Sequence, residues 1–333
     1  MPWETLRVCF LCLILLTAAY ILIKTFAPEK RHNSPSPKPR WPRKGAAIAV
    51  NISQHRASFE HIRSMLFFVG YPRSCSTLLG TFLDAHPHIV LAHEYNFFNV
   101  WSHVTDLVQK SSPQYIYSQL LGNSILASSK GGVRSPTKGD ADAGLFYHVP
   151  NQWNGRYNET IQVIGDKKAG STSWFASSKL IWKLHNVVKV PIRFLHVIRN
   201  PYDNIATIAI RSLNQGREFL VNEKILDDEE LLSRKINYYF HLVSKANQIR
   251  LRQNALDVHS IDLLLKPKMT LFRICNYLKI ECSEKYLRDC ASLLFKTPSQ
   301  SRKNVKWTRT LIKEVEIKMR PYDFLRRYSF ESD

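Results

Sequence analysis

The chain has 333 residues, of which 44% are hydrophobic and 22% charged. These proportions are ordinary for a globular protein, with room for one large domain or two small ones. The 47 Lys and Arg against 27 Asp and Glu give a formal net charge of +20, which indicates a partner with several phosphate or sulfate groups, nucleic acid or an anionic membrane, or simply a solvated basic surface. No cluster of Cys and His has zinc-ligand spacing, which argues against a zinc site.

An apolar run at residues 8–23 opens the chain. It is short for a spanning helix of about 20 residues, but flanking residues to 26 complete it. A cleavable signal peptide is the alternative, because Thr17-Ala18-Ala19 resembles a cleavage site of small residues. The lack of a basic region before the run favours an uncleaved anchor at 8–26, which follows a cytoplasmic tail at 1–7.

Residues 27–60 are rich in Pro, Lys, Arg and Ser without an apolar period, which predicts a stem or linker. The basic residues after the span would place this segment in the cytosol by the positive-inside rule. Two acceptor triplets for N-glycosylation, at Asn51 and Asn158, matter only in a lumen. We expect a luminal domain at 61–333, although the two signals disagree.

The folded region alternates short apolar runs with helical patterns. We expect strands at 65–70, 161–165, 192–198 and 255–261, each followed by a helix, at 76–85, 171–188, 201–213 and 268–278. Helical segments around 97–127 and 228–251 and an irregular stretch at 130–160 complete the pattern. Near-continuous apolar strands between helices predict a parallel sheet in an α/β fold. Ligands of such folds bind beyond the carboxyl ends of the strands.

The stretch GYPRSCST, Gly70–Thr77, follows the first expected strand. It has the frame of a nucleotide-binding P-loop, with Cys in place of the second glycine and Ser in place of the lysine. Its backbone N–H groups and the following helix N-terminus can still bind an oxyanion cluster, helped by the hydroxyls of Ser74, Ser76 and Thr77. Arg73 supplies a cation. The missing lysine argues against a kinase that binds ATP and magnesium. The alternative is that the loop is an ordinary strand–turn–helix connection without a binding function.

A second stretch, HVIRNPYDNIATIAIR, follows the strand expected at 192–198. Arg199 leaves the strand end, Thr207 follows eight residues later, and Arg211 lies four further on the same helical face. Two guanidinium groups and a hydroxyl on one side form a suitable clamp for a phosphate monoester. The alternative is that both arginines are solvated surface residues.

Together these two stretches resemble the cofactor segments of sulfotransferases that use 3′-phosphoadenosine 5′-phosphosulfate (PAPS). In that family the first loop cradles the 5′-phosphosulfate, which matches Arg73, Ser74, Cys75, Ser76 and Thr77, and an arginine with a Ser or Thr eight residues later binds the 3′-phosphate, which matches Arg199 and Thr207. A third block, VHSIDLLLKPKMTLFRICNYLKIECS, also resembles the family. The resemblance covers roughly residues 64–330 and implies a P-loop-type three-layer fold.

The layout is most similar to the membrane-anchored Golgi branch, which includes the tyrosylprotein sulfotransferases. There a glutamate after an LDAHP run acts as base, which matches Glu94; His93 is a weaker candidate, and an ordinary surface Glu is the alternative. The family's catalytic lysine matches Lys167 in GDKKAGS, with Lys168 as an ambiguity of one residue. The segment 297–307 resembles the loop that covers the cofactor, which would make Ser301 and Arg302 contacts.

Two positions depart from the family. Cys75 stands where glycine is usual, and we interpret it as tolerated because right-handed angles suffice near a helix start. Asn96 stands where the tyrosine-specific branch has an arginine for its acidic peptide. This departure makes a glycan hydroxyl our first choice of acceptor, and peptide tyrosine the second.

The resemblance therefore implies a single-pass type II Golgi membrane protein with a luminal PAPS-dependent sulfotransferase domain. We expect PAPS as donor, a glycan or protein acceptor, and neither a metal nor a nucleic acid. The rival interpretation is a relative that binds nucleotides or polyanions but has lost turnover because Cys75 disrupts the loop. One disulfide is plausible among Cys275, Cys282 and Cys290, but spacing does not reveal its pairing, and the sequence says nothing about oligomeric state.

Overall fold

The computed structural model describes residues 50–104, 111–129, 148–213, 225–294 and 297–332. The chain divides into two units, Met1–Gly45 and Ala46–Asp333. The predicted tail, the anchor at 8–26 and most of the stem lie outside the described residues. Within the described ranges, none of the helices combines the length and apolar character needed to cross a bilayer.

The second unit contains one sheet in which every strand is parallel to its neighbours, in the order β2-β3-β1-β4-β5. This confirms the parallel sheet and the α/β fold that the apolar runs predict. The strands are β1 (Ser64–Gly70), β2 (Ile89–Ala92), β3 (Val163–Asp166), β4 (Ile192–Ile198) and β5 (Leu256–His259). In register, Phe67 of the central strand lies between Asp166 of β3 and Phe194 of β4.

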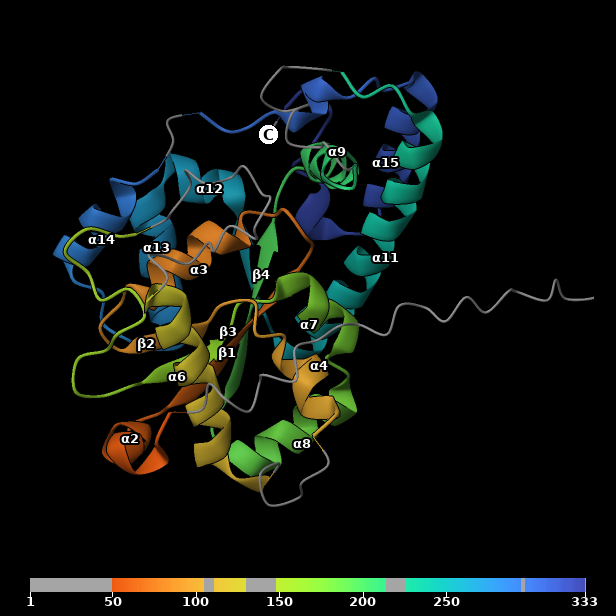
Figure 1. The fold of residues 1–333 in the computed structure, drawn as a ribbon. Helices are drawn as coiled ribbons and strands as arrows, with labels where there is room; N and C mark the ends of the chain where they lie inside the picture. The colour runs from red at the N-terminus through yellow and green to blue at the C-terminus, as the bar shows by residue number, and fades with distance from the viewer. Residues whose placement is uncertain (1–49, 105–110, 130–147, 214–224, 295–296, 333) are drawn as a thin grey trace, which may run out of the picture. The chain divides into compact units, whose positions relative to one another are not determined.

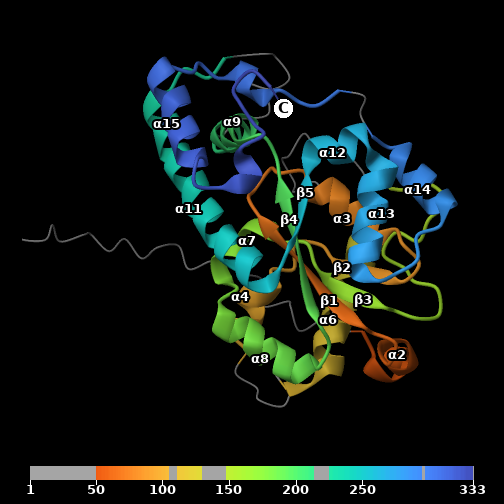
Figure 2. The ribbon, with the colours of Figure 1, turned by 180° about the vertical axis from the view of Figure 1, so that it is seen from behind.

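Helices cover both faces of this sheet (Figures 1 and 2). The described α-helices are α2 (Ile52–Phe59), α3 (Ser76–Asp84), α4 (Phe97–Ser102), α6 (Pro113–Ser129), α7 (Ala169–Phe175), α8 (Ser178–Val188), α9 (Pro201–Arg211), α11 (Glu229–Gln253), α12 (Ser260–Leu265), α13 (Pro267–Leu278), α14 (Glu284–Ala291) and α15 (Arg309–Met319). Two 3₁₀ turns, η2 (Ser301–Asn304) and η3 (Asp323–Leu325), accompany them.

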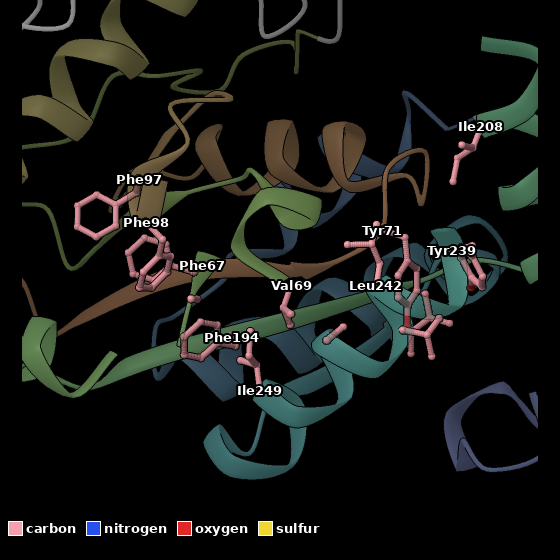
Figure 3. Packing of buried hydrophobic residues seen from close by; sticks show 14 of the residues in the cluster. Phe67, Val69, Tyr71, Phe97, Phe98, Phe194, Ile208, Tyr239, Leu242 and Ile249 are labelled. Atoms are coloured by element: carbon pink, nitrogen blue, oxygen red, sulfur yellow. The ribbon is translucent and has the colours of Figure 1, made fainter. Parts of the chain in front are cut away.

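The alternation of side chains along β1 divides the core in two. Phe67 and Val69 face the helices α4, α6, α8, α9, α11 and α15. Leu66 and Phe68 face α3, α12, α13 and α14. Because β1 is buried on both faces, it reads as a continuous apolar run. Figure 3 shows the first of these clusters, in which the rings of Phe67 and Phe98 lie 4.7 Å apart.

One expected helix is in fact two. The pattern at 171–188 predicts a single helix, but α7 ends at Phe175 and α8 begins at Ser178. Ser177 between them is extended, and its side chain accepts a hydrogen bond from the N–H of Leu180, so it caps α8. The expectation of one helix was wrong because a serine inside an amphipathic pattern can start a new helix.

The order of the strands decides where a ligand can bind. The chain leaves β1 toward α3 on one face of the sheet, and leaves the adjacent β4 toward α9 on the other face. The two connections diverge at the carboxyl ends of β1 and β4, which makes this edge the topological switch point, where ligands of α/β sheets bind. Both segments that resemble sulfotransferase motifs follow these two strands.

A disulfide joins Cys275 of α13 to Cys282 just before α14, with their Cα atoms 6.1 Å apart. Among the described residues, Cys75 and Cys290 are free thiols. The bond staples the turn that connects α13 and α14, two helices that pack on the same face of the sheet.

Asp84 at the end of α3 fastens β2 to its neighbours. Its buried carboxylate accepts from the N–H of Leu91 at 2.7 Å and from the Ser124 hydroxyl of α6 at 3.1 and 3.2 Å. Burial raises the pKa of Asp84 to about 7, although both hydrogen bonds act in the opposite direction. The carboxyl is therefore protonated in the folded chain under conditions in which it is ionised in the unfolded chain.

This difference predicts how Asp84→Asn changes the pH dependence of stability. The unfolded carboxyl loses its proton near pH 4 and the folded one only near pH 7. Between these values the folded chain holds more protons, so the stability of the wild type decreases as pH rises, by up to roughly 4 kcal/mol from this group. Asn cannot titrate, so this pH dependence should be absent from the variant. The difference between the unfolding free energies of the variant and the wild type, measured by urea titration, should therefore shift in favour of the variant as pH rises between these values. Parallel curves would contradict the buried carboxyl.

Candidate active site

The loop after β1 is shaped by residues with positive φ. Gly70 has a φ of 144°, and a Cβ there would lie 2.9 Å from the carbonyl oxygen of Val197 in β4. Arg73 (φ 69°) and Cys75 (φ 73°) are both left-handed. The expectation that Cys75 takes right-handed angles was therefore wrong: it adopts a conformation suited to glycine, at a cost of about 1–2 kcal/mol. Burial raises the pKa of its thiol, and the charge of Arg199 opposes this effect.

The N-terminus of α3 opens into this loop. Ser74 is completely buried, and its hydroxyl donates to the carbonyl of Tyr71 at 2.8 Å. This hydroxyl closes the loop, and the expected contact of Ser74 with the ligand stays a prediction. Cys75, at the N-cap, gives α3 no side-chain cap, so N–H groups of the first turn can donate to an anion. Ser76 and Thr77 are half-buried at the same helix start.

Lys167 links the carboxyl end of β3 to this helix start. Its side chain is almost fully buried, and its Nζ donates to the Thr77 hydroxyl at 3.1 Å and to Glu94. The neighbouring Lys168 is paired with the second carboxylate oxygen of Glu94. The structure thus brings Glu94, Lys167 and Thr77 together, and places Lys168 on the more exposed side of the same carboxylate.

Gly80 in α3 makes the buried position of Lys167 possible. A Cβ at Gly80 would lie 2.6 Å from Cγ of Lys167, so only glycine leaves room for the aliphatic part of the lysine against the helix. Gly inside a helix costs about 1 kcal/mol relative to Ala, and here its role is packing. A glycine interrupting the apolar helix pattern is the sequence signal from which this role could have been inferred.

Asp166 holds the loop that carries Glu94. Its carboxylate, which has no exposed surface, accepts from the N–H groups of Tyr95 at 3.2 Å and Phe97 at 2.9 Å. The residues that precede these two N–H groups, Glu94 (φ 58°) and Asn96 (φ 67°), are both left-handed. A strained backbone conformation of this kind persists where the surrounding contacts hold it in place. Sequence reasoning missed Asp166, although an acidic residue at a strand end beside a candidate lysine was a usable signal.

The charges of the two lysines dominate the electrostatics of Glu94. Burial by itself would raise the pKa of this carboxyl, but the opposing effects of Lys167 and Lys168 outweigh it and lower the pKa to about 2. Burial lowers the pKa of Lys167, and Glu94 opposes that effect. Glu94 is thus ionised at neutral pH, and its affinity for a proton is weak while both lysines contact it.

A second cluster lies at the start of α9. Arg199 donates through Nη1 to the Thr207 hydroxyl at 3.2 Å and through Nη2 to the Ser301 hydroxyl at 2.9 Å. Thr207 and Ser301 are themselves 2.9 Å apart. Arg199 also donates to the carbonyl of Arg73 at 3.2 Å, which ties this cluster to the loop after β1. Arg211, half-buried, is the last residue of α9, one turn beyond Thr207.

Arg302 forms a buried ion pair beside this second cluster. Its guanidinium is buried against the carboxylate of Asp203 at 2.6 Å, and its backbone N–H also donates to Asp203 at 2.9 Å. Both side chains are almost inaccessible, so the structure does not show the guanidinium available to a cofactor, and the predicted cofactor contact of Arg302 stays a prediction. Its ion pair fastens η2, which carries Ser301, to the first turn of α9.

Buried polar groups support the loop from below. The Tyr71 hydroxyl lies 2.7 Å from Nε2 of His196, whose Nδ1 lies 2.8 Å from Asp257. Asn204 of α9 donates to the carbonyl of Pro72. These residues are positioned by tertiary contacts with the loop, and sequence reasoning did not single them out. In the described part of the chain, no group of three or more His, Cys, Asp or Glu side chains is placed to bind a metal ion.

The Arg302–Asp203 pair predicts a large loss of stability in Asp203→Asn. The substitution leaves a guanidinium buried without its counter-charge, and removing one partner of such a pair typically costs about 3–5 kcal/mol. Urea denaturation should report that loss, whereas Lys303→Ala, at an exposed position beside Arg302, should stay within about 0.5 kcal/mol of the wild type. A loss below about 1 kcal/mol in Asp203→Asn would contradict the burial of the pair.

Comparison with known proteins completes this picture. The family model of the sulfotransferase family matches residues 66–284. Sulfotransferase STF9 from Mycobacterium avium is 12% identical, with 87% of this chain and 83% of that chain covered and a TM-score of 0.45. Mouse sulfotransferase SULT7A1 complexed with PAP is 13% identical, with 85% and 90% covered and a TM-score of 0.39. No curated protein sequence matches. The family match runs from β1 to the start of α14 and includes the loop after β1, Glu94, Lys167 and Arg199; the chain belongs to the sulfotransferase family.

Proposed function

We propose that the protein transfers a sulfuryl group from PAPS to a hydroxyl of a glycan or glycoprotein. The observation that carries this proposal is the buried Lys167, whose ammonium lies between the helix start at Thr77 and the carboxylate of Glu94. Sulfuryl transfer needs a cation near the leaving oxygen and a base near the attacking hydroxyl. The ion pair between Lys167 and Glu94 provides both the cation and the base.

The two ends of the donor match two separate parts of the site. The loop after β1 and the uncapped α3 offer backbone N–H groups and the hydroxyls of Ser76 and Thr77 to the 5′-phosphosulfate. Arg199, Thr207 and Ser301 offer a guanidinium and two hydroxyls to the 3′-phosphate. The hydrogen bond from Arg199 to the carbonyl of Arg73 couples the two parts.

The chemistry assigned to this chain is an in-line displacement at sulfur. Glu94 accepts the proton of the acceptor hydroxyl, whose oxygen forms the new bond to sulfur. The bond from sulfur to the bridging phosphate oxygen breaks with its electron pair, and adenosine 3′,5′-bisphosphate leaves. Lys167 and the N–H groups of the loop stabilise the charge that develops on the leaving phosphate. Residues of this chain supply all of these charges.

The ion pair between Glu94 and Lys167 makes the strength of the base depend on the donor. While both lysines contact Glu94, its pKa of about 2 makes it a poor proton acceptor. An oxyanion bound beside Lys167 competes with Glu94 for the ammonium. Weakening that contact raises the pKa of Glu94 toward its ordinary value, so the base gains strength when the donor is in place.

The surroundings of Asn96 support a glycan hydroxyl, rather than peptide tyrosine, as the proposed acceptor. Asn96 stands at the position of the arginine that the tyrosine-specific branch uses for its acidic peptide. Here Asn96 is buried, its side chain is paired with Ser171, and its backbone is left-handed. The position therefore offers no cation to an acidic peptide, which supports our first choice of acceptor.

We place the domain in the Golgi lumen, on a type II anchor. A disulfide between Cys275 and Cys282 is typical of proteins that fold in an oxidising compartment. Both acceptor asparagines, Asn51 and Asn158, are exposed. These two observations support a lumen, against the basic residues that follow the apolar run.

Glycans test this placement directly. When the full-length protein is made in eukaryotic secretory cells, we expect a peptide N-glycosidase to increase its electrophoretic mobility, because exposed Asn-x-Ser/Thr triplets are modified only in the lumen. The double variant Asn51→Gln and Asn158→Gln should show no shift. An unmodified wild-type protein of full mobility would contradict the luminal orientation.

The catalytic proposal is tested by transfer of labelled sulfate from PAPS to an array of glycan and peptide acceptors. Removing the cation in Lys167→Ala should lower kcat by about 10²–10³-fold, and Glu94→Gln should lower it by about 10²–10⁴-fold. Lys183→Ala, an exposed lysine on α8, is the matched control and should be unaffected.

Binding separates catalysis from a relative that has lost turnover. Calorimetry should detect adenosine 3′,5′-bisphosphate on the wild type and on Glu94→Gln, because Arg199, Thr207 and Ser301 are unchanged. Wild-type binding without transfer to any acceptor would favour the non-catalytic rival. Equal transfer by the wild type and both active-site variants would rule out the roles assigned to Lys167 and Glu94.

A further inference from the structure

A cavity with polar residues in its lining lies between α7, α8 and α11. Its volume is about 160 Å³, and Trp174, near the end of α7, forms part of its wall. The lining residues are Ser173, Trp174, Ala176, Ser177, Ser178, Ile181, Lys245, Gln248, Ile249, Arg252 and Gln253. Ligand pockets for drug-sized molecules span about 300–1,000 Å³, so this cavity suits a single small ring.

The charged residues of this lining are all basic. Lys245, Gln248 and Arg252 recur at helical spacing on one face of α11, so they point into the cavity together. Arg252 donates to the Ser178 hydroxyl at 2.9 Å, and Lys245 lies 5.9 Å from the centre of the Trp174 ring. None of the lining residues is acidic, so the cavity carries two cations that no carboxylate in its wall neutralises.

Trp174 is the other notable component. Its side chain is 49% exposed although it is one of the largest in the chain, and its ring lies 5.0 Å from that of His241. An exposed indole between cations and amides offers an apolar face beside hydrogen-bond donors. This combination suits a sugar ring. The C–H groups of the ring pack on the indole, while its hydroxyls and acidic groups pair with Lys, Arg and Gln.

The position of the cavity relates it to the site already described. Lys168, which contacts Glu94, is the N-cap of α7, and Trp174 stands near the end of the same helix. At 1.5 Å per residue the two are separated by about 9 Å along the helix axis. Because α7 contacts both α4 and α11 (Figure 1), it connects the loop of Glu94 with the wall of the cavity.

We propose that this cavity, which we call the α7–α11 subsite, binds an acidic sugar ring, a uronic acid or a sulfated saccharide, of the acceptor chain at a distance from the reacting hydroxyl. The inference rests on the proposed function, because it extends the acceptor from one hydroxyl to an anionic glycan chain. It names a substrate class: polymers that already carry carboxylate or sulfate groups. Acidic peptides are the competing occupant, but they lack the flat C–H face of a sugar ring that would pack on the exposed indole.

The test measures binding, so it does not depend on sulfuryl transfer. The full-length protein in detergent is titrated with a heparin-derived hexasaccharide by calorimetry. We expect Trp174→Ala and Lys245→Glu each to raise the Kd by about tenfold or more, and Trp174→Phe to retain most of the affinity. Trp182→Ala, which removes an exposed tryptophan of α8 outside the lining, is the matched control and should bind as the wild type does. All of these positions are accessible, and melting temperatures verify that the variants fold.

Four outcomes would overturn the subsite: a wild type that does not bind the hexasaccharide, a Trp174→Ala variant that binds as tightly as the wild type, neutral maltohexaose bound as tightly, or a polyglutamate peptide that competes equally well. The proposed function fails separately, if no acceptor receives sulfate from PAPS. Hexasaccharide binding that Trp174→Ala loses would in that case still establish the subsite. If both hold, Trp174→Ala should raise the KM of long acidic acceptors and leave that of PAPS unchanged.

Discussion

A buried ammonium group is the constraint on which the site depends. Lys167 is almost inaccessible to solvent, and an isolated charge in such a place would be very costly. The carboxylate of Glu94 and the hydroxyl of Thr77 offset that cost, and they belong to segments that follow β2 and β1. Satisfying one lysine therefore brings the ends of three strands together, at the edge where an α/β sheet binds its ligands.

Other features of the structure serve this contact. Gly80 leaves room for the lysine's aliphatic chain, and Asp166 holds the left-handed backbone on which Glu94 is presented. Both have a cost, one in helix propensity and one in the burial of a carboxyl whose pKa is raised to about 6. Features that cost stability and persist around one group are typical of functional sites.

Much of the fold followed from local pattern. The apolar runs predicted the strands β1 and β4 to within a residue, because strands buried on both faces have an unmistakable composition. The spacing of Thr207 and Arg211 predicted one face of α9. Local pattern was not sufficient where a residue has two possible roles: Ser177 could continue a helix or begin one, and Arg302 could bind a phosphate or pair with Asp203. Spacing along the chain cannot decide between such roles, because the partner is remote in sequence.

By itself, the sequence determined the fold class, the order of the motifs and the sulfotransferase resemblance, since each depends on residues close together in the chain. Only the tertiary structure decided how the loop GYPRSCST is built: Ser74 is turned inward, Cys75 is left-handed, and Lys167, which directly follows β3, contacts the helix start at Thr77. It likewise decided that Arg302 pairs with Asp203 and that α7 contacts α11, which lines a basic cavity. The physical reason is that burial and charge compensation are properties of contacts between distant segments, which no local pattern records.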